Sequence, residues 1–113
     1  MEWKGQYCSQ AEPSTRVATT AAQWAALWSD IGREAPQADL GTHFAAAVFL
    51  GQRNTGGYGV RFMEPVAEGK TLKIRYETLT PKGFVTQAFT QPYAVRLFPK
   101  TDLQVLVRET GNP

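Results

Sequence analysis

Cys8 and His43 are the only cysteine and the only histidine in this sequence, and both side chains can take part in nucleophilic catalysis. Such a pair would work only if the fold joined two distant segments. Nothing near Cys8 indicates a lowered thiol pKa. His43 directly precedes an apolar stretch, so we expect it to be a surface residue at the edge of a strand. A lone cysteine also excludes an intrachain disulfide. We therefore expect no catalytic residue and no enzymatic activity.

Metal-binding and nucleotide-binding patterns are also missing from the sequence. Asp30, Glu34 and Asp39 form a loose cluster, and a solvated surface explains them better than an acid–base pair. A metal site needs several His, Cys or carboxylate ligands at suitable spacing, so we expect no metal and no cofactor. The glycine-rich stretch 51–59 lacks the Gly-Lys-Ser/Thr of a phosphate-binding loop, and it leads into a predicted strand instead of a helix.

The glycine-rich stretch instead predicts a tight turn. Residues 54–57, Asn-Thr-Gly-Gly, lie between two predicted strands and tolerate positive φ, as in a hairpin connection. Tyr58 follows directly, and aromatic side chains beside Gly-rich turns are common in recognition surfaces. Residues 91–93 open another predicted strand and could place a second aromatic side chain at the same end of the sheet. The candidate partner-binding residues are Asn54, Thr55, Gly56, Gly57, Tyr58, Gln91, Pro92 and Tyr93.

The elements that must position these residues are one helix and several strands. Apolar residues recur at helical spacing after Thr20, and Thr20 with Gln23 three residues later matches a capping box. Gly32 is suited to end a helix, so a helix is predicted over residues 21–31. Trp24 and Trp28 should be buried against the sheet, because their spacing puts them on one face. Alternating apolar residues predict strands around residues 58–63, 71–76, 93–97 and 103–107, with weaker signals around 3–8 and 16–18.

Two longer-range features complete the predicted fold. Residues 44–50 are apolar on both faces, which predicts a central strand, and residues 93–108 are predicted to form a hairpin with a turn over 99–102. Strands surround one helix at spacings too short for repeated βαβ units. The fold class expected is therefore mainly β (α+β), an antiparallel β-sandwich or open barrel with one docked α-helix.

Length and charge limit the classes of partner. A chain of 113 residues fits one domain, 1–113. Its formal charge is only +2 and its basic residues are spread along the chain, so nucleic-acid binding is not expected. No stretch approaches the roughly 20 apolar residues of a membrane span, and residues 1–6 lack the apolar region of a secretory signal. We expect a protein partner, or a homodimer made through an exposed strand.

Residues 49–60, Phe-Leu-Gly-Gln-Arg-Asn-Thr-Gly-Gly-Tyr-Gly-Val, resemble the core signature of PrcB-like domains, a family named for a protease-complex subunit. In that family an apolar strand leads into Gly-x-x-x-Thr-Gly-Gly-Tyr and then into an alternating strand. Three further matches follow the family's order: residues 23–28 resemble its helix, residues 35–40 its Pro-x-x-Asp-Phe linker, and residues 90–95 its Thr-x-Pro-Tyr strand start. Leu40 stands where the family usually has Phe.

The resemblance implies a domain without catalysis of its own, which supports the stability or maturation of a partner protease. It also implies export in bacteria, often as a lipoprotein or as part of a longer envelope protein. Residues 54–58 and 91–93 are in addition similar to two loops that chagasin-like inhibitors insert into cysteine proteases, with Gln91 and Tyr93 in place of Arg and Trp.

Three functional hypotheses stay open at this point. The first is a protein-binding module in which Tyr58 and Tyr93 are exposed anchors. The second is a structural or homodimerising domain, in which Tyr58 is buried and the Gly-Gly-Tyr signature only serves the fold. The third is a direct cysteine-protease inhibitor.

Overall fold

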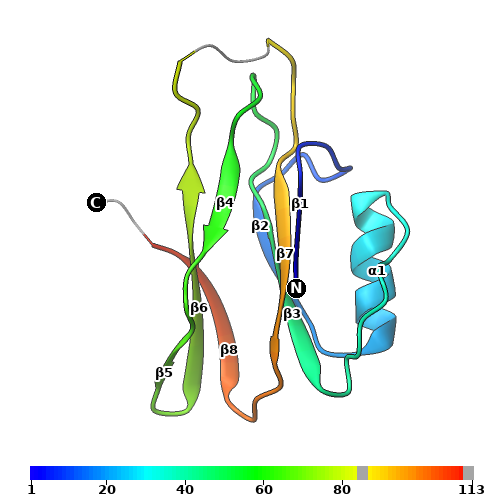
Figure 1. The fold of residues 1–113 in the computed structure, drawn as a ribbon, viewed down its shortest axis with the longest axis vertical. Helices are drawn as coiled ribbons and strands as arrows, with labels where there is room; N and C mark the ends of the chain where they lie inside the picture. Colours follow the sequence, from blue (N-terminus) through cyan, green and yellow to red (C-terminus); the bar gives the residue numbers. More distant parts are fainter. Residues whose placement is uncertain (84–86, 111–113) are drawn as a thin grey trace.

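Eight strands and one helix make up the described part of the chain, which is residues 1–83 and 87–110 of a computed structural model. Figure 1 shows two sheets, with the helix on the outer side of the sheet that contains β1. The expected mainly β fold with a docked helix is confirmed. In chain order the elements are β1 (Glu2–Gly5), β2 (Ser14–Ala18), α1 (Ala21–Ile31), β3 (His43–Phe49), β4 (Gly59–Phe62), β5 (Val66–Glu68), β6 (Thr71–Leu79), β7 (Tyr93–Pro99) and β8 (Gln104–Glu109).

The strands form two sheets that pack face to face. The first sheet is antiparallel throughout and has the order β1-β7-β3-β2. In the second sheet β6 is central: β4 and β5 pair with it antiparallel, and β8 pairs with it in parallel. A hydrophobic core from β3, β4, β6 and β7 fills the space between the sheets. The described residues therefore form a sandwich and not a closed barrel.

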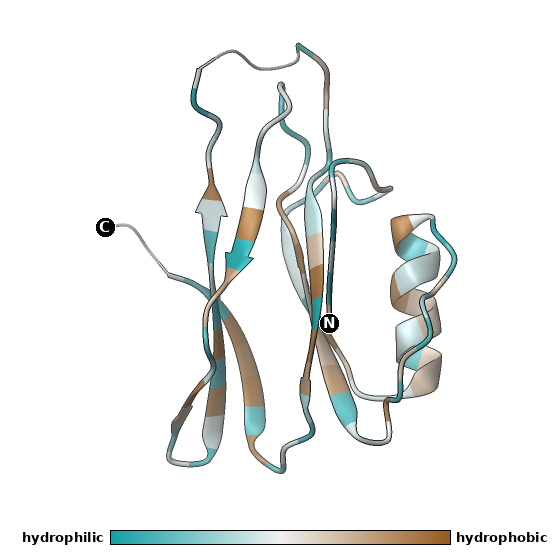
Figure 2. Cartoon of the chain, in the orientation of Figure 1, coloured by the Kyte–Doolittle hydropathy of each residue, from teal (hydrophilic) through white to brown (hydrophobic). Residues whose placement is uncertain are grey.

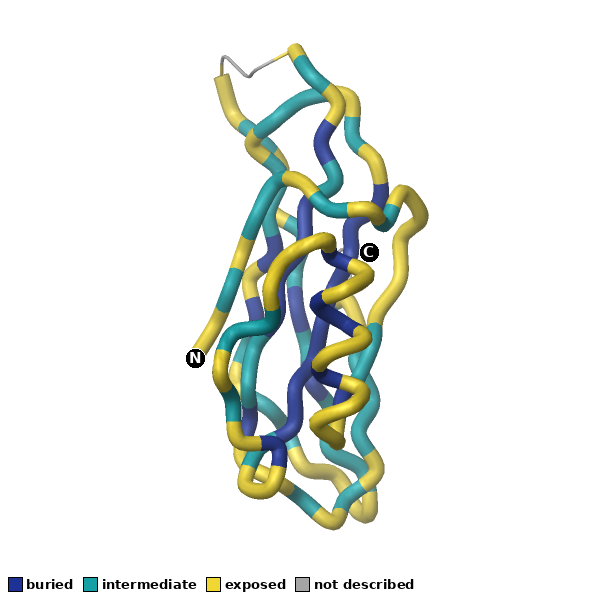
Figure 3. The backbone as a smooth tube through the Cα atoms, turned by 90° about the vertical axis from the view of Figure 1, so that its right-hand side faces the viewer, coloured by how far each residue is buried: buried dark blue, intermediate teal, exposed yellow. Residues whose placement is uncertain are grey.

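The central strand β3 buries both of its faces, as its apolar sequence predicts. Ala45, Ala47 and Phe49 belong to the core under the helix, while Phe44 and Val48 belong to the core between the sheets. The small alanines leave room for the large side chains of the helix to pack closely. Hydrophobic residues follow β3 and β7 in Figure 2, and Figure 3 shows the same layer as buried.

The helix α1 begins and ends at the predicted residues. Thr20 is its N-cap, and the Thr20 hydroxyl accepts a hydrogen bond from the backbone N–H of Gln23 at 3.1 Å. The Gln23 side chain accepts in turn from the backbone N–H of Thr19 at 2.7 Å, one residue earlier than in a standard capping box. Gly32 ends the helix with a φ of 90°, in the left-handed region that glycine tolerates.

Aromatic side chains hold the helix on the first sheet. Trp24 and Trp28 are 5% and 2% exposed, and their ring centroids lie 5.4 and 5.8 Å from that of Trp3 in β1. Trp28 also meets Tyr93 of β7 edge to face, with centroids 6.3 Å apart. The Trp24 indole N–H donates to the carbonyl of Pro36 at 2.8 Å, which ties the chain after the helix to this cluster. The predicted burial of both helix tryptophans is confirmed.

Two predicted hairpins are wrong, because the strands concerned lie in different sheets. β1 and β3 occupy both edges of β7, so the chain crosses to the second sheet after Pro99 and β8 pairs with β6. Residues 54–57 do not close a hairpin either, since β3 belongs to the first sheet and β4 to the second. The glycine-rich segment is thus part of a connection between the two layers.

Candidate partner-binding loop end

Two connections between the sheets meet at one end of the sandwich, at the top of Figure 1. They are residues 50–58, between β3 and β4, and residues 80–92, between β6 and β7, of which 84–86 lie outside the described residues. We call these two connections the loop end. Arg53 and Thr90 exchange backbone hydrogen bonds of 2.8 and 2.9 Å across it. The two segments that the sequence singled out therefore do lie together.

Side chains fix the shape of the loop end from inside. Thr90 is 1% exposed, and its hydroxyl donates to the carbonyl of Thr55 at 2.8 Å. From the β1–β2 connection, the Gln6 side-chain amide donates to the carbonyl of Tyr58 at 2.8 Å, and the Gln6 carbonyl accepts from the backbone N–H of Gln91 at 2.8 Å. These bonds satisfy backbone groups in segments that lack the hydrogen-bond ladder of a β-sheet, so they favour a single loop conformation.

Gly57 is required by the backbone at its position. Its φ is 94°, and a Cβ built there would lie 2.7 Å from the Cβ of Pro81 in the other connection. Residues other than glycine rarely adopt this φ, and Pro81 leaves no room for a side chain at this position. Gly57 therefore lets the two connections of the loop end touch each other.

Tyr58 is half-buried and packs against the core between the sheets. The guanidinium carbon of Arg53 lies 4.9 Å from the centroid of its ring, and the same guanidinium donates to the carbonyl of Leu50 at 3.2 Å. A cation over an aromatic face contributes about 0.5–1 kcal/mol at an exposed site. Tyr58 thus has neither the full burial of a core residue nor the free exposure of an isolated anchor.

Tyr93 and Pro92 are buried, so the expectation of two exposed tyrosines side by side is wrong. Tyr93 is 3% exposed and belongs to the core under the helix, whereas Tyr58 packs in the core on the other side of the first sheet. Successive side chains of a strand alternate between the two faces, and the register of β7 turns Tyr93 toward the helix. The role of Tyr93 in the loop end is therefore that of a support.

The exposed side chains of the loop end are mostly uncharged. Phe89, next to the backbone bridge, is 63% exposed and was missed by sequence reasoning. The exposure of Phe89 could have been suspected from the sequence, because this aromatic residue stands in a segment with neither strand nor helix periodicity. Gln52, Asn54 and Gly57 are also exposed, and Thr55, Gly56 and Gln91 are half-buried.

Cys8 and His43 lie at opposite ends of the first sheet. The Cys8 sulfur is 3.4 Å from the carbonyl of Gln91, just before β7, whereas His43 pairs with Pro99, the last residue of β7. Burial raises the pKa of the Cys8 thiol above its ordinary value of 9.0, the opposite of what a nucleophile needs. The geometry therefore offers no thiol–imidazole pair.

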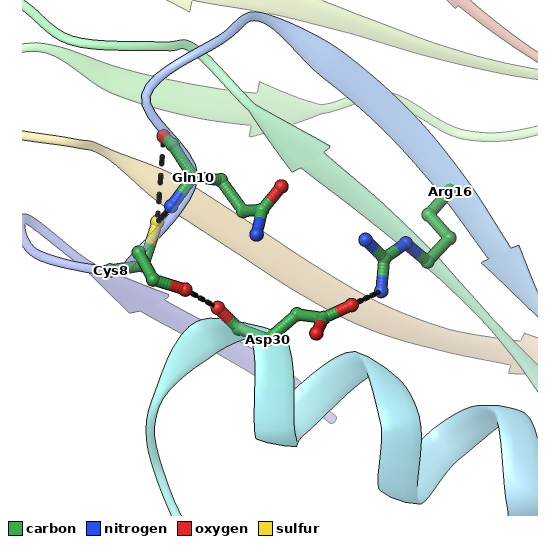
Figure 4. A network of polar contacts seen from close by, with 5 residues as sticks. Cys8, Gln10, Arg16 and Asp30 are labelled. Carbon is green, nitrogen blue, oxygen red and sulfur yellow. Dashed lines mark hydrogen bonds and ion pairs between the residues drawn. The ribbon is translucent and has the colours of Figure 1, made fainter.

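The acidic residue at the end of the helix has structural contacts, which Figure 4 shows. The Asp30 carboxylate pairs with Arg16 of β2 at 2.8 Å, and the Asp30 carbonyl accepts from the hydroxyl of Ser9 in the β1–β2 connection.

Over residues 1–83 and 87–110, no three His, Cys, Asp or Glu side chains come together as metal ligands. The helix in this part of the chain has 11 residues, too few to span a bilayer.

A separate hollow of about 600 Å³ lies between β1 and the chain that follows α1. Aromatic side chains of Trp3, Trp28 and Tyr93 line it together with two acidic and two basic residues. Since these charges balance, the hollow indicates no class of ligand.

Residues 45–96 match the family model for the PrcB C-terminal domain. The match begins in β3, ends in β7 and includes both connections of the loop end. It confirms the resemblance carried by the Thr-Gly-Gly-Tyr and Thr-x-Pro-Tyr segments. Comparison with curated proteins and with solved structures found no match.

Proposed function

We propose that this chain is a non-catalytic protein-binding module, which associates with and stabilises or regulates a protease or envelope protein complex, and that the loop end contacts the partner. The class of partner is suggested by the family, which is named for a protease-complex subunit. The loop end is suggested by the hydrogen-bonded backbone and the exposed side chains of its described residues.

That combination is the observation that carries the proposal. Partly buried hydrogen bonds from the side chains of Thr90 and Gln6 hold the backbone, while Phe89 and Asn54 stay exposed. Aromatic side chains are the residues that most often dominate binding energy. Because these bonds already hold residues 50–58 and 90–92, association would avoid part of the ordering cost, which is about 0.5–1.5 kcal/mol for each immobilised side chain.

The alternative is a structural or homodimerising domain in which the signature serves only the fold. The burial of Thr90 and Tyr93 and the positive φ of Gly57 favour this interpretation for those three residues. They do not explain why Phe89 and Asn54 are exposed. Direct insertion into a cysteine protease has less support, because an inserted loop must expose its aromatic residue and Tyr93 is buried.

The absence of catalysis is part of the proposal. It is supported by the separation of Cys8 from His43 along the first sheet and by the raised thiol pKa of Cys8. A nucleophilic thiol needs a nearby base and a lowered pKa.

Crosslinking from the loop end tests the proposal. A photoreactive amino acid in place of Phe89, in protein expressed in its source cells, should crosslink to one partner that mass spectrometry identifies. The control carries the same group in place of Asp102, an exposed residue between β7 and β8 at the bottom of Figure 1. Phe89→Ala should then weaken binding of the identified partner at least about tenfold. Crosslinks from position 102 and none from position 89 would contradict the proposal.

A further inference from the structure

The strand β1 forms an open edge of the first sheet. Among the described residues it pairs only with β7, and in Figure 3 it runs up from the N-terminus along the left side of the molecule. The strand at the other edge of this sheet, β2, lies against β8 of the second sheet. In β4, Val60 and Phe62 are 1% and 7% exposed, whereas Glu2 and Lys4 of β1 are both exposed. An exposed edge strand is a template for pairing with another chain.

The register with β7 determines which backbone groups of β1 are free. The backbone N–H of Leu97 donates to the carbonyl of Met1 at 3.0 Å, so every second residue from Met1 onward, including Trp3, bonds β7. The N–H and C=O groups of Glu2 and Lys4 therefore point away from β7. Outside the ladder with β7, no backbone group of the described residues pairs with them.

The two residues with free backbone groups carry opposite charges. The side chains of Glu2 and Lys4 share one face of β1, and the carboxylate lies 3.1 Å from the ammonium. If a second copy of β1 pairs antiparallel with its Trp3 opposite Trp3, each Glu2 lies opposite Lys4 of the other copy. Both pairs then join residues whose backbone groups point outward, as hydrogen-bonded pairs require. Opposite charges at such cross-strand positions stabilise a sheet, so this edge is complementary to itself.

We propose that the edge of β1 binds a second copy of this chain, antiparallel and with Glu2 of each copy opposite Lys4 of the other. The two four-stranded sheets then become continuous. Trp3, which is half-buried, meets Trp3 of the second copy beside the hollow that Trp28 and Tyr93 line. This inference does not depend on the proposed function of the loop end.

Sedimentation velocity of the whole chain measures the association. Because β1 has only four residues, the interface is small, and small interfaces are transient. The average mass should rise from that of a monomer toward that of a dimer between about 1 μM and about 1 mM. A monomer at every concentration would overturn the inference. If a photoreactive group in place of Glu2 then crosslinked a different protein in the source cells, the edge would belong to that partner.

Charge reversal tests the pairing of Glu2 with Lys4. Glu2→Lys and Lys4→Glu each turn two attractive pairs into repulsive ones, so each should weaken dimerisation about tenfold at low salt. The double variant Glu2→Lys/Lys4→Glu should dimerise as the unchanged chain does. Lys73→Glu is the matched control, because it breaks a similar exposed pair with Glu68 in the second sheet, 3.2 Å long, and should leave dimerisation unchanged.

An equimolar mixture of Glu2→Lys and Lys4→Glu separates pairing from a folding defect. The mixed dimer has opposite charges at both positions, so the mixture should associate more tightly than either variant alone. Failure of the mixture and of the double variant to restore association would overturn the inference, as would single reversals without effect. Phe89→Ala should leave dimerisation unchanged. Loss of the dimer in Phe89→Ala would assign the contact between copies to the loop end and not to β1.

Discussion

Aromatic side chains have opposite surroundings under the helix and at the loop end. Under the helix, Trp24, Trp28 and Tyr93 are at most 5% exposed and meet edge to face. At the loop end, Tyr58 is half-buried and Phe89 is 63% exposed. The first region gains stability from apolar area removed from water, while the second keeps its shape through hydrogen bonds to its backbone. The two regions therefore differ in what holds them, and we propose that recognition belongs to the loop end and not to the surface under the helix.

One short segment connects the two regions. The Thr90 hydroxyl holds the β3–β4 connection at the loop end, and three residues later Tyr93 packs on Trp28 under the helix. Two residues of the Thr-x-Pro-Tyr signature thus act as supports rather than as contacts. The comparison predicts that substitutions under the helix affect folding and that substitutions of exposed loop-end residues affect binding.

Removal of a helix tryptophan should have the largest effect. Trp28→Ala leaves a cavity among Trp3, Trp24 and Tyr93, and we expect the free energy of unfolding to fall by about 3–5 kcal/mol. Urea denaturation followed by circular dichroism measures this loss. Ser29→Ala is the control on the exposed face of the same helix and should change stability by less than about 0.5 kcal/mol. An unchanged midpoint for Trp28→Ala would remove the argument that this cluster docks the helix.

Gly57→Val should have the next largest effect. The valine must adopt a φ near 94° and would place its Cβ 2.7 Å from Pro81, so we expect a loss of about 2–3 kcal/mol. Gly69→Val provides the matched control: φ is 60° there, but nothing lies within 4 Å of the added Cβ. The backbone strain alone should cost about 1–2 kcal/mol at Gly69. Equal losses at the two positions, measured by thermal unfolding, would show that the contact between the connections adds nothing.

Tyr58→Ala separates the binding hypothesis from the structural one. Because Tyr58 is half-buried under Arg53, we expect a modest loss of about 1–2 kcal/mol in stability together with binding at least about tenfold weaker. Stability and the affinity of the folded fraction are measured separately. A loss of several kcal/mol with unchanged affinity would favour the structural domain.

Substitution of Cys8 and His43 should have the smallest effect. Cys8→Ser and His43→Ala should leave partner binding and any measured activity unchanged, because neither residue has catalytic groups beside it.

Since burial raises the Cys8 pKa, the thiol of the folded protein should react with iodoacetamide more slowly than that of the urea-unfolded chain at the same pH. The folded state should also lose stability as the pH rises above 9.0, because it retains the proton longer than the unfolded chain. Faster alkylation of the folded protein would indicate an activated thiol.

The features that depend on local periodicity could be predicted from the sequence. The helix over residues 21–31, with its cap at Thr20 and its end at Gly32, follows from 3.6-residue spacing and from cap chemistry. The burial of β3 on both faces follows from its unbroken apolar run. The resemblance to the PrcB C-terminal domain was also readable, because its motifs are short and contiguous.

Long-range contacts set which strands pair and which face of a strand each side chain takes. Alternation shows that Tyr93, Val95 and Leu97 share one face of β7, but not whether that face meets the helix or the second sheet. The partner of β8 depended on the edges of β7 being occupied by β1 and β3, a condition set by residues far away in the sequence. The exposure of Phe89 and the burial of Tyr93 follow from these long-range pairings, because local spacing carries no information about what lies across a sheet.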